Sequence, residues 1–155
     1  MNEHDLLKQG FLATAAPLYA DITLLLEIGM AVALLLGAFL ARLRKYRWHA
    51  ICQTAVVLLN LLTILKLMVP AFHPGVLLKL SDNTARSYYL LSSVHGVLGI
   101  AAESLALYVL LVAGTKALPA RLRFRNYKFW MRCTLLLWWS ALLLGVATYV
   151  RWYVL

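Results

Sequence analysis

The sequence predicts an all-α fold: an integral membrane four-helix bundle with up-down connections and both termini on the outer (periplasmic or extracellular) side. Hydrophobic residues make up 63% of the 155 residues and charged residues only 14%, whereas soluble domains are about half apolar and a quarter charged. Four apolar stretches, Ile22 to Ala41, Ala50 to Val69, Tyr88 to Ala113 and Cys133 to Val150, can each cross a hydrocarbon core roughly 30 Å thick. The basic residues gather in two regions that such helices would bring to one side of the membrane.

Residues 1–155 are predicted to form a single transmembrane domain, whose elements follow in order. Residues 1–20 form an outer N-terminal arm, and no basic leader or cleavage site precedes the first apolar stretch, so we expect that stretch to be retained. Helices are expected at about 22–41, 50–69, 88–113 and 131–151. The second should stop near Pro70, because proline cannot donate a helical hydrogen bond. Short connections make neighbouring helices antiparallel.

The distribution of basic residues predicts the orientation. Ten of the fifteen Lys and Arg residues lie in or beside the connections after the first and third expected helices: Arg42, Arg44, Lys45, Arg47, Lys116, Arg121, Arg123, Arg125, Lys128 and Arg132. Such residues favour the cytoplasmic side, which places the termini outside and the chain in the cell inner (cytoplasmic) membrane as a multi-pass protein. We therefore interpret the net charge of +9 as a topology signal that contacts the lipid bilayer, and not as a nucleic-acid site.

Ionisable residues interrupt the apolar stretches at Glu27, Lys66, His95 and Glu103, and such groups inside a membrane often mark a functional site. Glu27 and Lys66 are expected within about 8 Å of the outer helix ends. An ion pair between them is the simplest interpretation, although Lys66 could instead reach the interface and leave Glu27 free. Glu103 lies about two turns below His95 on the same helix face, which suits a proton relay or a buried hydrogen-bond donor.

The polar residues of the second and third helices recur at steps of three and four, so each set shares one face that should point into the bundle. The two sets are His49, Gln53, Val56, Asn60 and Thr63, and Ser92, His95, Gly99 and Glu103, with Gly96 alongside. The simplest interpretation of Gln53, Asn60, Thr63 and Ser92 is hydrogen bonding between helices. Gly96 and Gly99 would let a helix or a flat cofactor approach closely, and we predict them as cofactor-binding positions.

Three histidines are the candidate metal ligands: His73, His95 and His49. Imidazole is a common ligand of transition metals and of haem iron. His73 and His95 belong to the outer side and could share one metal or haem, whereas His49 begins the second helix at the inner edge and cannot ligate the same ion. Each imidazole could also be purely structural. No Cys-x-x-Cys-His run occurs, so a haem would be held non-covalently, as haem b is.

The chain resembles the CtaM/YozB family of small four-helix membrane proteins. The resemblance covers about residues 22–153 and rests on Arg44-Lys45-Tyr46-Arg47-Trp48-His49, on His73 and His95, and on Arg132, Trp138, Gly145 and Tyr149 in the last helix. It implies a role in maturing haem–copper terminal oxidases, with His49, His73 and His95 as the ligands carried over. Arg125-Asn126-Tyr127 stands where the family pattern has a further histidine, which weakens a model with two metal centres.

These observations give a leading function and two alternatives. The leading one is a respiratory-chain membrane protein that binds haem or copper through histidines, as an oxidase assembly factor or a small electron-transfer subunit beside other respiratory subunits. The first alternative is a non-catalytic accessory or anchor subunit of a larger complex. The second is a proton- or quinone-handling element that uses Glu27, Glu103 and His95. Enzymatic turnover finds little support, because no nucleophile–base set or phosphate-binding loop occurs.

Overall fold

The fold is known from a computed structural model, which describes residues 9–72, 87–114, 119, 121, 123 and 126–155. Its helices are α2 (Leu18–Arg42), α3 (Tyr46–Thr63), η1 (Ile64–Met68), α4 (Val69–Phe72), α6 (Ser87–Gly114) and α7 (Tyr127–Tyr153). Because α3, η1 and α4 form one continuous rod, the described chain contains four helices long and apolar enough to cross a membrane. The predicted all-helical fold with four helices that could cross a membrane is confirmed.

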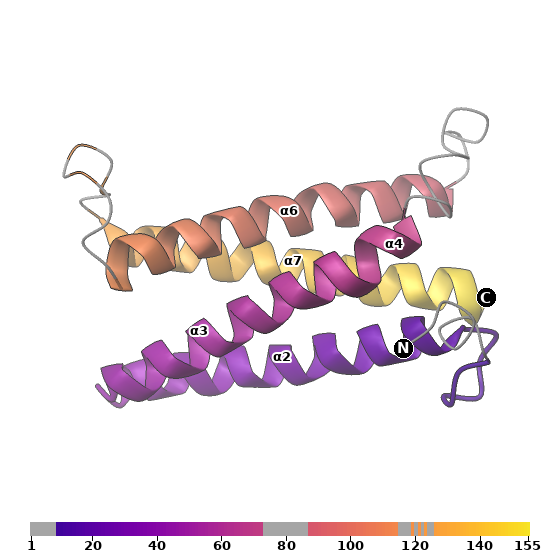
Figure 1. The fold of residues 1–155 in the computed structure, drawn as a ribbon, viewed down its shortest axis with the longest axis horizontal. Coiled ribbons are helices and arrows are strands. Elements are labelled where there is room, and N and C mark those ends of the chain that lie inside the picture. Colours follow the sequence, from indigo (N-terminus) through magenta and orange to yellow (C-terminus); the bar gives the residue numbers. More distant parts are fainter. Residues whose placement is uncertain (1–8, 73–86, 115–118, 120, 122, 124–125) are drawn as a thin grey trace.

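The four rods pack as two antiparallel hairpins, one of α2 with α3 and one of α6 with α7 (Figure 1). The hairpins meet where α3 faces α6 and where α2 faces α7, which closes an up-down bundle. The first described residues and the end of α7 lie together, and the Ala15 N–H donates to the Tyr153 carbonyl over 3.4 Å. We call this the arm end, and we call the opposite end, where α2 turns into α3 through residues 43–45, the basic end.

Three helices begin four residues earlier than the sequence predicts: α2, α7 and also α3, which starts at Tyr46 instead of 50. The first starts at Leu18 instead of 22, directly after Pro17, which sits in extended conformation at its N-cap. Proline is favoured around helix starts, since its missing N–H has no intrahelical partner there. The last helix starts at Tyr127 instead of 131, where the Asn126 side chain accepts a hydrogen bond from the Phe129 N–H over 3.3 Å. This cap satisfies a free backbone donor of the first turn.

The second rod continues through Pro70 to Phe72, two residues beyond the stop expected near Pro70. The preceding turn is wider than an α-helical turn: the Val69 N–H bonds to the Ile64 carbonyl, five residues earlier. Pro70 lacks an N–H, and its ring would clash with the carbonyl four residues before it, which belongs to Lys66. The π-helical segment Ile64–Met68 surrounds that carbonyl, so the wider turn accommodates the proline without ending the helix.

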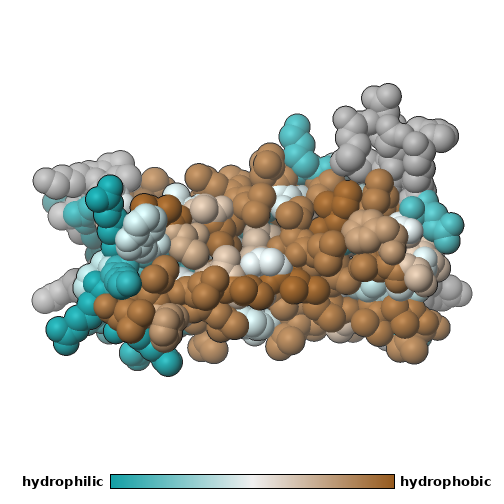
Figure 2. All heavy atoms as spheres, turned by 90° about the horizontal axis from the view of Figure 1, so that it is seen from below, coloured by the Kyte–Doolittle hydropathy of each residue, from teal (hydrophilic) through white to brown (hydrophobic). Residues whose placement is uncertain are grey.

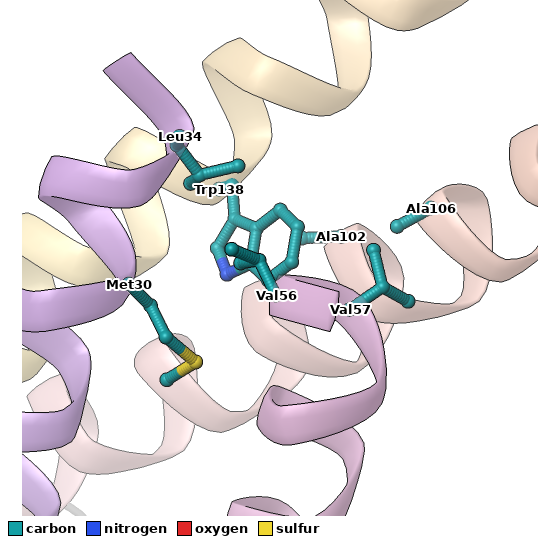
Figure 3. Close-up of a cluster of buried hydrophobic side chains, with 7 residues drawn as sticks. All are labelled: Met30, Leu34, Val56, Val57, Ala102, Ala106 and Trp138. Atoms are coloured by element: carbon teal, nitrogen blue, oxygen red, sulfur yellow. The ribbon is translucent and has the colours of Figure 1, made fainter. Parts of the chain in front are cut away.

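The interior combines a small apolar core with several polar side chains. Figure 3 shows the core, in which the Trp138 indole of α7 lies among residues of the other three rods: Met30, Leu34, Val56, Val57, Ala102 and Ala106. The small Ala102 and Ala106 side chains of α6 leave room for the large Trp138 indole at the same level of the bundle. The buried polar residues are Asp21, Asn60, Thr63, Ser92, Glu103 and Thr134.

The outer surface is mostly apolar along its length. Leu36, Leu62, Val97 and Leu136, one from each rod, are all more than half exposed. Figure 2 shows this apolar face, with hydrophilic side chains gathered at the basic end. Apolar residues outside and polar residues inside are the arrangement expected of helices that face lipid.

Candidate functional site

The polar faces predicted for the second and third helices do point into the bundle. Asn60 and Thr63 of α3 and Ser92 and Glu103 of α6 are each at most 5% exposed. Thr63 donates its hydroxyl hydrogen to the Leu59 carbonyl of its own helix over 2.9 Å. The interior therefore holds two separate polar groups between the rods, one around His95 and one around Glu103.

His95 bridges α6 and α7. Its Nδ1 lies 2.8 Å from the Ala141 carbonyl oxygen. The ring also lies over Gly145, where an added Cβ would be 2.9 Å from its Cε1. A carbonyl oxygen can only accept, so Nδ1 carries the hydrogen and Nε2 keeps its lone pair. One bond and one close contact thus fix both the orientation and the tautomer of this imidazole.

The second rod ends beside the α6 turn that carries His95. The Phe72 ring lies 3.8 Å from the position that a Cβ on Gly96 would take. A Cβ on Gly99 would meet no heavy atom within 4 Å. The Phe72 ring therefore covers the α6 surface at Gly96, whereas the surface at Gly99 is open. His73, predicted as the second ligand, lies outside the described residues.

Glu103 and Asn60 form the second polar group. The Asn60 Nδ2 donates to the Glu103 Oε2 over 2.9 Å, and each residue is only 4% exposed. The other oxygens of the two side chains, Glu103 Oε1 and Asn60 Oδ1, are buried without a hydrogen-bond partner. Glu27 of α2 is half-buried and close enough to interact electrostatically with Glu103. Three rods thus bring two carboxyl groups and one carboxamide together.

Lys66 does not join this group. Its side chain is exposed. Lys66 and Glu27 both belong to the described part of the chain, and no ion pair links them there. The predicted ion pair is absent for two reasons. Lys66 lies in the π-helical segment, where the wider turn changes the direction of its side chain. Because α2 starts at Leu18, Glu27 also lies about 14 Å from the helix start, deeper than the predicted 8 Å.

The third histidine, His49, lies near the basic end as predicted, far along the bundle from His95. Its Nδ1 lies 2.8 Å from the Gly37 carbonyl of α2. Two neighbouring side chains of α3 also donate to carbonyls of α2: Cys52 to Ala33 over 3.3 Å, and Gln53 to Leu34 over 3.5 Å. These contacts support the interpretation of this part of the polar face as hydrogen bonding between helices.

Asp21 is a buried group that sequence reasoning missed, because its position before the first apolar stretch suggests an outer charge exposed to water. It is completely buried and accepts hydrogen bonds from the Phe11 and Leu12 N–H groups over 2.7 and 2.8 Å. The Tyr149 hydroxyl donates to its other oxygen over 2.6 Å. We call residues 9–17 with Asp21 and Tyr149 the arm latch. The signal in the sequence was an acidic residue shortly after a proline, in the first turn of a helix.

The described residues contain no group of three or more His, Cys, Asp or Glu side chains arranged to hold a metal ion. Within this part of the chain, His95 and His49 each present an imidazole oriented by a backbone carbonyl, and the two lie far apart along the bundle. Comparisons of the chain with protein-family models, with curated proteins and with solved structures gave no match.

Proposed function

We propose that this chain is a multi-pass protein of the cytoplasmic membrane that binds haem b or copper through His95 and serves the respiratory chain. The observation that supports this most directly is the contact of 2.8 Å between His95 Nδ1 and the Ala141 carbonyl. Histidines that ligate metals almost always donate their other ring N–H to a carbonyl or carboxylate, which fixes the ring and leaves Nε2 for the metal. His73 is the expected second ligand.

The surroundings of His95 fit a flat ligand better than a compact metal cage. Gly96 and Gly99 present no side chain, and the nearest atoms to a Cβ on Gly96 are the Phe72 ring carbons at 3.8 and 3.9 Å. A haem plane can approach the open surface at Gly99 closely, because no side chain projects from the helix there. When bound, a haem or copper would supply one-electron transfer, and the protein would supply the His95 imidazole and its orientation.

The assignment to the respiratory chain rests on the resemblance to the CtaM/YozB family, in the basic turn before His49 and in the last helix. An oxidase assembly factor or a small electron-transfer subunit would use an outer-side His95 site, since the positive-inside pattern puts the arm end outside. The alternative of an accessory subunit uses the same fold without a cofactor.

The test is the visible spectrum and metal content of protein purified from its native membrane. We expect a Soret band or stoichiometric copper that disappears in His95→Ala. His49→Ala is the matched control, because it removes an imidazole with the same carbonyl contact near the opposite end of the bundle. A flat spectrum and no copper in the unaltered protein would overturn the proposal, and stoichiometric partner subunits without a cofactor would support the accessory role. Equal loss in both variants would mean that binding is not specific to His95.

A further inference from the structure

The polar group around Glu103 and Asn60 has too few hydrogen-bond donors for its buried acceptor atoms. Glu103 Oε1 and Asn60 Oδ1 are both buried, and neither has a hydrogen-bond partner. A carboxylate oxygen and an amide oxygen can only accept, so they cannot satisfy each other. Buried polar atoms are nearly always paired, and an unpaired one destabilises the fold by about 1–3 kcal/mol. Two unpaired acceptors in one place indicate that a donor is missing.

A single proton would supply that donor. With a hydrogen on Oε1, Glu103 becomes a carboxylic acid whose hydroxyl can donate, while its Oε2 still accepts from the Asn60 Nδ2 over 2.9 Å. A carboxylic acid and a carboxamide are complementary: the amide N–H donates to the acid carbonyl, and the acid O–H donates to the amide carbonyl. Asn60 offers one donor and one acceptor of the kind that a neutral Glu103 requires.

The charges of the neighbouring elements also favour a bound proton. Glu27 of α2 interacts electrostatically with Glu103, and like charges repel each other more strongly in a medium of low dielectric constant than in water. On the second rod, Lys66 is exposed and makes no ion pair with either acid within the described structure. On α7, the residues from 134 to 147 include no ionisable side chain. On α6, the nearest ionisable side chains along the helix are Tyr108, five residues after Glu103, and His95, eight residues before it.

We propose that Glu103 is a proton-binding site inside the membrane, held neutral in a complementary pair with Asn60. This site does not depend on a metal or haem at His95. It gives the bundle a proton position about 12 Å from that histidine along α6, by the helical rise.

Infrared spectroscopy tests the site directly, because the carbonyl stretch of a neutral carboxyl group is separate from the bands of carboxylates and amides. The full-length protein in lipid vesicles at neutral pH should show this band, with an intensity of about one group. It should disappear in the double variant Glu27→Gln/Glu103→Gln. Asn60→Leu, which removes the donor to Oε2, should move the band to higher frequency. Asp21→Asn is the matched control, since it alters a buried carboxyl in the arm latch, and it should leave the band unchanged.

The possible results separate the proposal from its alternatives. A spectrum without a neutral carboxyl band would show that both acids are ionised and would overturn the proposal. Survival of the band in the double variant, or an unchanged frequency in Asn60→Leu, would overturn it as well. Circular dichroism of each variant checks that the helices remain folded. Loss of the Soret band or copper with an intact carboxyl band would reject only the function proposed for His95.

Discussion

Asp21 and Tyr149 join the first rod of the bundle to the last through a hydrogen bond of 2.6 Å, with the Tyr149 hydroxyl as the donor. The same hydroxyl lies 2.8 Å from Thr14 Oγ1 in the arm. The carboxylate also accepts two backbone N–H groups of the arm, so one buried side chain holds α2, α7 and residues 9–17 together. Gly10 is part of this arrangement, because a Cβ there would collide with Asp21 Oδ2.

Replacing Asp21 should release the arm. Asp21→Asn removes the negative charge, so the Phe11 and Leu12 N–H groups, which share one oxygen, keep only a neutral amide acceptor. Hydrogen bonds to charged groups contribute about 1.5–3 kcal/mol each, and we expect a loss of at least about 2 kcal/mol in unfolding free energy. Hydrogen exchange at Phe11 and Leu12 should accelerate. Tyr149→Phe removes the hydroxyl contacts with Asp21 and Thr14 but leaves the two backbone hydrogen bonds to the carboxylate. Exchange at Phe11 and Leu12 as fast as in Asp21→Asn would therefore show that the arm is not held by the carboxylate.

Some of this architecture could be predicted from the sequence, and the reason is physical. Four long apolar stretches and inward polar faces follow from the insolubility of polar groups in lipid, which leaves little freedom at positions such as Asn60 and Glu103. The contacts of Asp21 and the π-helical turn before Pro70 could not be predicted in this way. They depend on which backbone groups of distant segments meet, and residue spacing within one helix does not contain that information.

The partners of Glu27 show the same distinction. Its expected depth in the membrane depends on a helix start at 22, four residues after the actual start at Leu18, and that depth favours Lys66 as its neighbour. A helix start one turn earlier and the wider turn around Lys66 are enough to separate Glu27 from Lys66. The group that interacts electrostatically with Glu27 is then the carboxyl of Glu103. Periodicity predicts the face of a helix well, but the facing residue also depends on the ends of both helices.

The contact between His95 and Gly145 should be sensitive to a single methyl group. Gly145→Ala would place a Cβ 2.9 Å from the His95 Cε1, closer than carbon atoms normally approach. The imidazole must move, and its contact with Ala141 weakens. We expect a loss of about 1–3 kcal/mol in detergent unfolding, as for other overpacked sites. Gly29→Ala is the control, because a Cβ there meets nothing within 4 Å, and it should be neutral or slightly stabilising.

Glu27 and Lys66 should behave as independent residues. A double-mutant cycle with Glu27→Gln and Lys66→Gln should give a coupling energy near zero, because Lys66 is exposed and no ion pair joins the two side chains. The matched cycle for Asn60→Leu and Glu103→Leu should give about 1 kcal/mol, since these side chains share a buried hydrogen bond of 2.9 Å and each change removes it. Detergent unfolding measures both. A Glu27–Lys66 coupling as large as that of the matched cycle would contradict the separation of the two side chains.

The orientation in the membrane can be measured with two single cysteines. In a background with Cys52→Ser and Cys133→Ser, Leu155→Cys reports on the arm end and Lys45→Cys on the basic end, and both positions are exposed. Because basic residues remain on the cytoplasmic side, a membrane-impermeant maleimide should label Leu155→Cys in intact spheroplasts and Lys45→Cys only after lysis. The reverse pattern would put the arm latch and His95 toward the cytoplasm. It would then exclude an outer-side haem or copper site while leaving the Glu103 proton site intact, since that site depends only on packing inside the bundle.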